Sequence, residues 1–348
     1  MRRIGLAVLL LAAGCRSIGP GTVARDRFDY STAISDSWKR QILLNIVKVR
    51  YADPPIFVDV GQVVSGYTLE YGATAGGTLT SGADTVTLGG SARYTDRPTI
   101  TYVPLTGHKF QRALMAPLLP ASVFSAIQAG WPAEGVLFAS VEAINGLRNE
   151  RMGPAGVTAA DEGFLRVVEI FGRLQRSGAV ALRVKAEGDG DGMIITFRTE
   201  DIPPETAAES AELRQLLRLD PLAKDLRLSY GQIAEDNREV AVLTRSVMQM
   251  MNVLASHAEI PEGDVTEGRA NPGWESAGPG VESRSKFRLR CSKEKPKDAF
   301  VSVPYRDHWF WIDDRDMASK RHFAFVMFLF TLADTADRGG EPVLTIPT

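Results

Sequence analysis

The sequence contains little cysteine, little histidine and no excess of charge of either sign. Its 348 residues include two cysteines and four histidines. No HExxH motif, no Walker A motif and no G-x-S-x-G motif is present, so the common signatures of a metal site, a phosphate loop and a hydrolase nucleophile are missing. Basic and acidic residues number 40 and 42, which provides no basic surface for nucleic acid. We therefore expect no cofactor, no metal and no nucleic-acid partner.

The first fifteen residues, MRRIGLAVLLLAAGC, have the pattern of an export signal. Two arginines precede an apolar run over residues 4–13, which is too short for a bilayer-spanning helix of about 20 residues. The ending LAAGC resembles the lipobox of bacterial lipoproteins. That resemblance implies a signal peptide over residues 1–14, cleavage before Cys15 and acylation of Cys15, with palmitate among the acyl groups. A plain signal peptide with an incidental cysteine is the alternative.

A lipid-anchored chain of this kind belongs in the bacterial cell envelope. Arg16, and not an aspartate, follows Cys15. In lipoproteins of enteric bacteria a residue other than aspartate at this position directs delivery to the outer membrane, so we expect an outer-membrane anchor and a periplasmic body. Several acyl chains on Cys15 would make this anchor stable. Cys291 then has no intramolecular disulfide partner. It lies in the strand-like run FRLRC, and we expect it to be a buried small residue and not a nucleophile.

The mature chain divides into three segments by composition. Residues 15–34 are polar and interrupted by glycine and proline, which is typical of a tether. Residues 35–103 begin with a helix over 35–50 and continue into a long β-hairpin. Residues 104–348 form an α+β globular body with a long, breaker-rich loop at about 259–285.

Residues 66–94, GYTLEYGATAGGTLTSGADTVTLGGSARY, alternate apolar and polar side chains but are diluted with glycine and alanine. A turn at residues 81–84 pairs Leu79 with Val86 and assigns every side chain to one of two faces. The larger side chains of the apolar face are the expected contacts to a membrane or to another subunit: Tyr67, Leu69, Tyr71, Leu79, Val86, Leu88 and Tyr94. The opposite face is polar and rich in threonine.

Two interpretations of this hairpin remain open. In the first, it lies on its own domain or on a neighbouring subunit, and its glycines permit close approach of another backbone. In the second, it inserts into the membrane, with the three tyrosines of its base at the lipid–water interface. The edges of a single hairpin would leave unpaired backbone groups in lipid. The second interpretation therefore requires several subunits, each contributing a hairpin to one closed sheet.

Hydrophobic periodicity divides the rest of the chain into short strands and amphipathic helices. We expect helices over residues 120–129, 159–178, 203–219, 246–257 and 319–336, and strands within 56–64, 135–149, 179–199, 225–231, 238–244, 286–313 and 342–347. The apolar run 323–332 is half as long as a membrane span and is expected to be a buried core helix. The predicted class is α+β, with mainly antiparallel hairpins alternating with amphipathic helices, plus one long glycine-rich hairpin.

One acidic cluster is a candidate for acid–base chemistry. The segment YRDHWFWIDDRD places five titratable side chains beside Trp309 and Trp311: Asp307, His308, Asp313, Asp314 and Asp316. In the alternative, which we favour, the two tryptophans alternate on a strand while Asp313 or Asp314 caps the following helix. The motif GDGDG, residues 188–192, lacks the remaining acidic ligands of a calcium loop and predicts a turn between two strands. We therefore do not expect an enzyme.

Beyond the lipobox, the segments RPTITYVPLTG, QAGWP, INGLRN, HWFWIDDRD and PVLTIP resemble a group of bacterial envelope proteins without assigned activity. The resemblance implies an envelope location and no mechanism. We expect an outer-membrane lipoprotein that is a structural, scaffold or export and assembly component, which oligomerises through its hairpin and contacts other envelope proteins. The alternatives are a monomeric periplasmic lipoprotein that binds a ligand or partner through exposed aromatics such as Trp274, and a hydrolase-like enzyme that uses Asp307, His308, Asp313 and Asp314.

Overall fold

The computed structural model describes residues 19–64, 66–80, 83–153, 156–187, 190–198, 200–277 and 282–335. These residues form helices and several mostly antiparallel sheets, so the predicted α+β class is confirmed. The chain divides into two compact units, one of Met1–Trp38 and Phe57–Leu105 and the other of Lys39–Ile56 and Thr106–Thr348. Among the described residues, no helix combines the length and the apolar content needed to cross a membrane.

Helix α2 (Gly19–Arg50) begins well before residue 35, where the sequence predicted its start. Pro20 lies in its first turn, where a proline leaves no intrahelical hydrogen bond unmade. The described part of the segment predicted to be a tether, residues 15–34, is therefore helical. Side chains over residues 31–37 are exposed, so this part of the helix contributes little burial.

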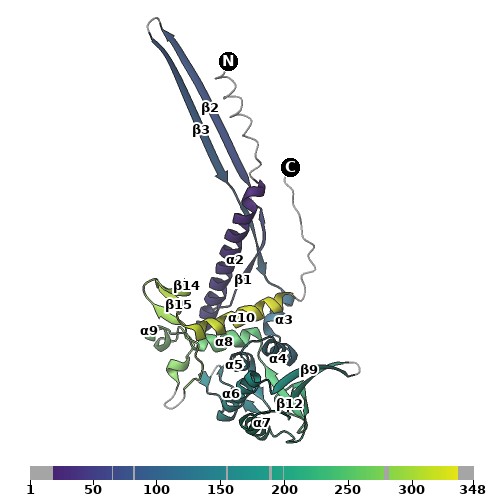
Figure 1. Ribbon diagram of the computed structural model, residues 1–348. Helices are drawn as coiled ribbons and strands as arrows, with labels where there is room; N and C mark the ends of the chain where they lie inside the picture. The colour runs from purple at the N-terminus through teal and green to yellow at the C-terminus, as the bar shows by residue number, and fades with distance from the viewer. Residues whose placement is uncertain are drawn as a thin grey trace. The chain divides into compact units, whose positions relative to one another are not determined.

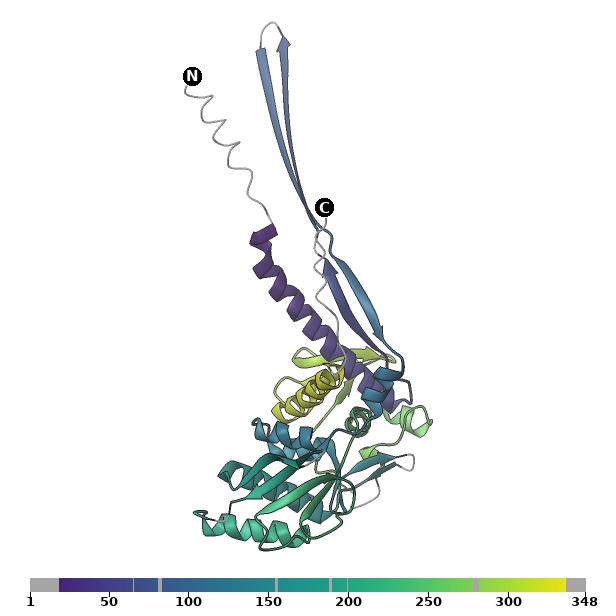
Figure 2. The same ribbon diagram turned by 90° about the vertical axis from the view of Figure 1, so that its right-hand side faces the viewer.

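The first unit contains two strand pairs, and the strands of one pair lie in the sequence between the strands of the other (Figure 2). β1 (Phe57–Val64) pairs antiparallel with β4 (Thr99–Leu105), and a bulge between Val60 and Gln62 interrupts their register. β1 is the strand predicted within residues 56–64. Between β1 and β4 the chain forms the predicted long hairpin.

The hairpin consists of β2 (Tyr67–Thr80) and β3 (Ala83–Asp96), which pair antiparallel along their whole length (Figure 1). We call this pair the ribbon. Leu79 pairs with Asp84, so the predicted pairing of Leu79 with Val86 is wrong by two positions. The last pair of the ribbon is Thr80 with Ala83, so the strands extend further than the predicted four-residue turn at residues 81–84 allows. Because the shift is an even number, the division of the positions between two faces stays as predicted.

The second unit, the body, contains a six-stranded sheet. Its strand order is β6 (Leu147–Arg148), β5 (Val141–Ile144), β12 (Glu239–Thr244), β11 (Asp225–Tyr230), β10 (Gly190–Phe197) and β9 (Val180–Glu187). β11 and β12 are parallel, and the other pairs are antiparallel. The predicted Asn-Gly turn joins β5 to β6, with positive φ angles at Asn145 and Gly146 as a tight hairpin turn requires.

Four helices belong to the same part of the body: α4 (Pro120–Gln128), α5 (Ala133–Ser140), α6 (Glu162–Ser177) and α7 (Pro204–Leu216). The sequence predicted a strand throughout residues 135–149, and this is wrong for the first half, which is helix α5. A short apolar run such as GVLFAS fits a buried strand and a buried helix equally well. Helix α6 confirms its prediction: Phe164, Val167 and Leu174 are buried, and Gly178 ends the helix in the left-handed conformation.

Ion pairs join the exposed faces of α6 and α7. The Arg166 guanidinium binds both carboxylate oxygens of Glu212, at 2.6 and 2.7 Å, and Arg173 pairs with Glu209. The Arg166 guanidinium also lies 3.0 Å from Glu169 on its own helix. These exposed pairs orient the two helices more than they stabilise them, because such pairs are worth about 0–1 kcal/mol each.

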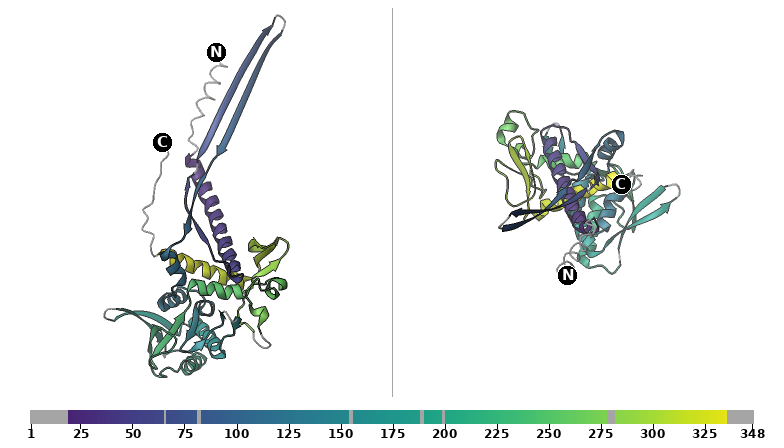
Figure 3. Two further views of the ribbon diagram at one scale, coloured as in Figure 1. Left: turned by 180° about the vertical axis from the view of Figure 1, so that it is seen from behind. Right: turned by 90° about the horizontal axis from the view of Figure 1, so that it is seen from above.

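The C-terminal part of the body packs a small sheet and several helices together (Figure 3). The sheet has the order β13 (Arg290–Ser292), β15 (His308–Asp313), β14 (Ala299–Tyr305), and a separate hairpin joins β7 (Arg151–Gly153) to β8 (Gly156–Thr158). The helices are α3 (His108–Met115), α8 (Val247–Ser256), α9 (Glu262–Thr266), α10 (Met317–Thr335) and a 3₁₀ turn, η1 (Trp274–Ser276). Phe323, Val326 and Leu329 of α10 are buried, as predicted for a core helix.

Candidate functional site

The base of the ribbon carries the predicted tyrosines, and two of them stack. The ring centroids of Tyr67 and Tyr94 lie 6.1 Å apart with an interplanar angle of 19°. The Tyr67 hydroxyl donates to the carboxylate of Asp26 in helix α2, and Arg25 of the same helix forms a hydrogen bond with Tyr94. Tyr71, further along the ribbon, is 74% exposed. The first unit thus fastens the base of the ribbon to α2.

Above its base, the ribbon consists of two strands alone. Among the described residues, β2 and β3 pair with no other strand. Each strand has 14 residues, which makes the ribbon about 45 Å long. Side chains over residues 70–74 and 89–94 are exposed on both faces. An isolated two-stranded hairpin is at best marginally stable in water.

Several residues named from the sequence lie outside what the structure describes. Cys15 precedes residue 19, and the strand predicted over 342–347 follows residue 335. The backbones of four ribbon residues are described, but their side chains are not: Leu69, Leu79, Val86 and Leu88. The proposed contacts of these four side chains, and the acylation of Cys15, stay predictions.

Cys291 lies on β13, and its side chain is half-buried. Burial, together with the negative charges of Glu259 and Asp264, raises the pKa of its thiol to about 11. The thiol is therefore protonated at neutral pH, and a protonated thiol is a poor nucleophile. Its environment favours the structural role that the sequence predicted.

The structure separates the acidic cluster of residues 307–316 into two groups. His308 begins β15 and Asp313 ends it. About 17 Å of extended strand lies between their backbones, at about 3.3 Å per residue. His308 and Asp313 therefore do not form an acid–base pair.

The cap of helix α10 is Asp316, which lies directly before Met317, the first helical residue. Its carboxylate accepts hydrogen bonds from the Ser319 N–H at 3.1 Å and the Ser319 hydroxyl at 2.6 Å. The prediction that Asp313 or Asp314 caps this helix is wrong. The chain makes a further turn between the end of β15 and the helix, which moves the cap to the later aspartate.

The two tryptophans of β15 alternate with buried residues, as predicted. Phe310 between them is fully buried, whereas Trp309 and Trp311 lie on the opposite face of the sheet. The Arg290 guanidinium lies 5.3 Å from the centroid of Trp311, and the Lys295 ammonium lies 5.4 Å from that of Trp309. These cations occupy the faces of the rings by cation–π attraction.

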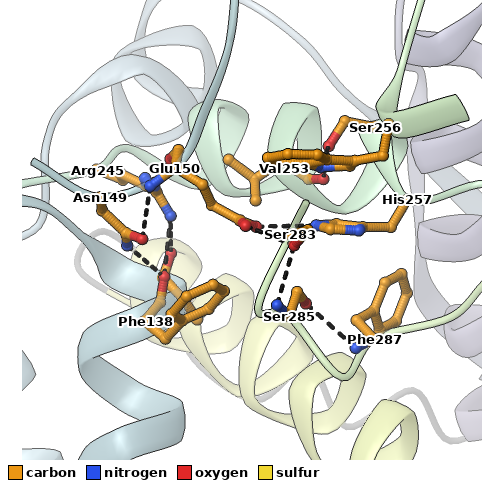
Figure 4. A network of polar contacts seen from close by, with 12 residues as sticks. Phe138, Asn149, Glu150, Arg245, Val253, Ser256, His257, Ser283, Ser285 and Phe287 are labelled. Atoms are coloured by element: carbon orange, nitrogen blue, oxygen red, sulfur yellow. Dashed lines mark hydrogen bonds and ion pairs between the residues drawn. The ribbon is translucent and has the colours of Figure 1, made fainter. Parts of the chain in front are cut away.

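The body contains a buried polar network that the sequence did not single out (Figure 4). Glu150 is 1% exposed, and its carboxylate accepts a hydrogen bond from the Ser283 hydroxyl at 2.6 Å. The other carboxylate oxygen lies 2.9 Å from His257 Nε2, which is placed to donate a hydrogen bond to it. Glu150 precedes β7, His257 follows α8, and Ser283 lies near the end of the predicted long loop. One carboxylate therefore joins three distant segments.

Arg245 forms one end of this network. It is 1% exposed, and its Nη1 donates to the carbonyls of Phe138 at 3.0 Å and Ala139 at 3.2 Å, while Nη2 donates to the carbonyl of Glu150. Burial lowers the pKa of Arg245 to about 10, against the opposing effect of the charges on Glu150 and Glu142. The guanidinium keeps its charge at neutral pH, and the Glu150 carboxylate balances it.

Arg50, the last residue of α2, is a second buried cation. Its Nη1 donates to the carbonyl of Ser256 at 3.3 Å, and its Nη2 pairs with the carboxylate of Glu275. Its Nε is buried and has no hydrogen-bond partner among the described residues. Burial lowers the pKa of Arg50. Gly273 lies so close to the guanidinium that a side chain there would overlap it.

Trp274 connects the two buried arginines. Its ring stacks on His257 with centroids 5.6 Å apart, and its Nε1 donates to the Ser256 hydroxyl at 3.1 Å. The expectation that Trp274 is an exposed contact residue is therefore wrong. The described part of the predicted loop at 259–285, which contains α9 and η1, is held to the body by this network. Within the described residues, His, Cys, Asp and Glu side chains form no group of three that could hold a metal ion.

Searches among family models, curated proteins and solved structures found no match to this chain.

Proposed function

We propose that this protein is a lipid-anchored component of the bacterial cell envelope that assembles with copies of itself through the ribbon. The observation that carries the proposal is the pair of open edges on β2 and β3. In an antiparallel pair, every second residue directs its N–H and C=O away from the partner strand, which gives about seven such residues on each edge here. A second ribbon alongside would satisfy these groups.

The composition of the ribbon favours pairing between copies. Soluble proteins protect exposed strand edges with lysine, proline or inward-pointing charges. Residues 67–96 contain no lysine and no proline, and their charged side chains are limited to Glu70, Asp84, Arg93 and Asp96. Glu70 is directly opposite Arg93, so these two charges neutralise each other within one copy. The edges therefore carry almost nothing that would repel an identical strand.

The predicted anchor supports the same role. Acylation of Cys15 would confine every copy to one membrane surface, and confinement raises the effective concentration for association. The contacts of Tyr67 and Tyr94 with α2 then hold the ribbon at its base. A scaffold or an export and assembly component needs such a directed, repeated contact between subunits.

Shortening the ribbon tests this proposal. In the variant, residues 73–90 are deleted and Gly72 is joined to Ser91, its register partner, through Asn-Gly. The tyrosines of the base remain. We expect the intact acylated protein in mild detergent to have the mass of several subunits and the shortened protein to be a monomer, as measured by light scattering.

A charged variant is the matched control for the loss of length. Thr74→Lys with Ser91→Lys keeps the full ribbon but places like charges on identical copies, and we expect partial dissociation that added salt reverses. A monomeric intact protein would contradict the proposal and favour the monomeric binding lipoprotein. A shortened variant that keeps the full multi-subunit mass would show that another surface assembles the protein.

A further inference from the structure

A cavity of about 810 Å³ lies in the body between α5, α6, α10 and residues 284–286. Large apolar side chains line it: Trp131, Val136, Phe138, Leu165, Val168 and Phe325. The ring centroid of Trp131 lies 5.2 Å from that of Phe325 and 5.6 Å from that of Phe328. This volume lies within the range of small-molecule sites, about 300–1,000 Å³. The aromatic floor suits an apolar ligand.

Besides Arg166, which pairs with Glu169 and Glu212, three cations line the cavity: Arg284, Lys286 and Arg321. The side chain of each makes no ion pair or hydrogen bond with another described residue. Of the carboxylates at the cavity, Glu134 pairs with Arg176 at 3.1 Å and Glu169 pairs with Arg166 at 3.0 Å. Glu162, in the first turn of α6, is the remaining one. The cavity thus has an excess of uncompensated positive charge.

Two of these cations, Arg284 and Lys286, alternate in the sequence with Ser283, Ser285 and Phe287, whose hydrogen bonds belong to the buried network (Figure 4). Ser283 donates to Glu150, and its hydroxyl also accepts the N–H of Ser285 at 2.9 Å. The Ser285 hydroxyl in turn accepts the N–H of Phe287 at 3.1 Å, and Phe287 is 2% exposed. These contacts fix the backbone on both sides of Arg284 and Lys286. The charges therefore stand on a segment that is held in place before any ligand arrives.

His322 adds an uncharged polar group to the lining. Its Nδ1 lies 2.9 Å from the carbonyl of Ala318 and must donate to it, which leaves Nε2 as an acceptor. Burial is the main cause that lowers the pKa of His322, so the ring is neutral at pH 7. It can accept a hydrogen bond from a ligand hydroxyl but adds no charge.

We infer that this cavity binds a single-chain acyl anion, an alkyl chain that ends in a carboxylate. The chain would lie against the aromatic floor formed by Trp131 and Phe325, and the carboxylate would lie at the three cations. An uncharged chain of the same length would gain the apolar contacts but none of the charge-assisted hydrogen bonds. This inference is independent of the assembly through the ribbon.

The inferred binding of an acyl anion can be tested by displacement of a fluorescent probe. A dansyl-labelled undecanoate is bound to the acylated full-length protein in a neutral detergent and is then displaced by unlabelled ligands. We expect dodecanoate to displace the probe about tenfold better than dodecanol does. The triple variant Arg284→Gln, Lys286→Gln, Arg321→Gln should lose this preference. All three side chains are exposed, so its melting temperature should stay that of the wild type. The triple variant Lys293→Gln, Lys295→Gln, Lys297→Gln removes the same charge elsewhere in the body and should leave displacement unchanged.

Gly135→Leu provides a second variant that fills the cavity. Gly135 lies in helix α5 and lines the cavity, and a Cβ there meets no atom within 4 Å. Leucine also favours the helix over glycine, so the fold should be kept. We expect this variant to lose the binding of both dodecanoate and dodecanol. Equal displacement by the two ligands, equal losses in both triple variants, or full binding by Gly135→Leu would each overturn the inference.

Discussion

Replacement of Gly273 by alanine is expected to destabilise the body by about 3–4 kcal/mol, because it would force a buried cation out of its place. The backbone at Gly273 has φ −125°, which alanine adopts without strain. The obstacle is the guanidinium of Arg50, which an alanine Cβ would overlap. Arg50 is 0% exposed and is held by Glu275 and by the Ser256 carbonyl, so it has no free space into which to move.

Urea denaturation followed by circular dichroism measures this effect. Gly263→Ala is the matched control, because a Cβ at this position in α9 meets no atom within 4 Å and should be neutral or slightly stabilising. The double variant Arg50→Ala, Gly273→Ala should lose less unfolding free energy than the two single variants lose together, because removing the guanidinium makes room for the methyl group. A Gly273→Ala protein within about 1 kcal/mol of the wild type would refute the packing account.

The second large effect is expected at Glu150. Its replacement by alanine removes the partner of two partly buried polar side chains, Ser283 and His257, and the charge that balances Arg245. Breaking a buried pair by removing one member costs about 3–5 kcal/mol. Glu150→Gln keeps the shape and one acceptor oxygen but loses the charge, so we expect an intermediate loss.

The same denaturation measurement distinguishes charge from packing at Glu150. Glu142, which is half-buried and accepts a hydrogen bond from Gln249 at 3.1 Å, provides the control, and Glu142→Gln should cost less than about 1 kcal/mol. Combining Arg245→Met with Glu150→Gln removes both charges and should recover part of the loss. If Glu150→Ala and Glu142→Gln lose equal stability, the buried network is not a distinct stabilising feature.

Much of the fold could be predicted from periodicity. Helix α6 has an apolar stripe and a glycine end, and the hairpin has strict alternation, so both were expected at nearly their observed positions. The helix over 133–140 was missed because its short apolar run has no clear period. The register of the ribbon was missed by two positions because the small and polar residues at the tip permit more than one turn.

The buried network could not be predicted from local pattern. Arg50 follows the apolar run ILLNIVKV, and Arg245 stands between the strand segment AVLT and the capping residue Ser246. Each is a single charge at the end of a buried element, which is the one signal that the sequence offers. Their partners come from segments more than 90 positions away, such as Glu150 for Arg245 and Glu275 for Arg50. Tertiary contact alone brings these residues together.

Hydrogen–deuterium exchange over residues 67–80 and 83–96 tests most directly whether the ribbon pairs between copies. In a lone hairpin, the outward amides, about half of those in each strand, have no partner and exchange at the rate of an unstructured peptide. If the ribbons of neighbouring copies pair along their edges, we expect both the inward and the outward amides to be protected in the intact protein in mild detergent. Rapid exchange of the outward half at all protein concentrations would contradict assembly through the ribbon.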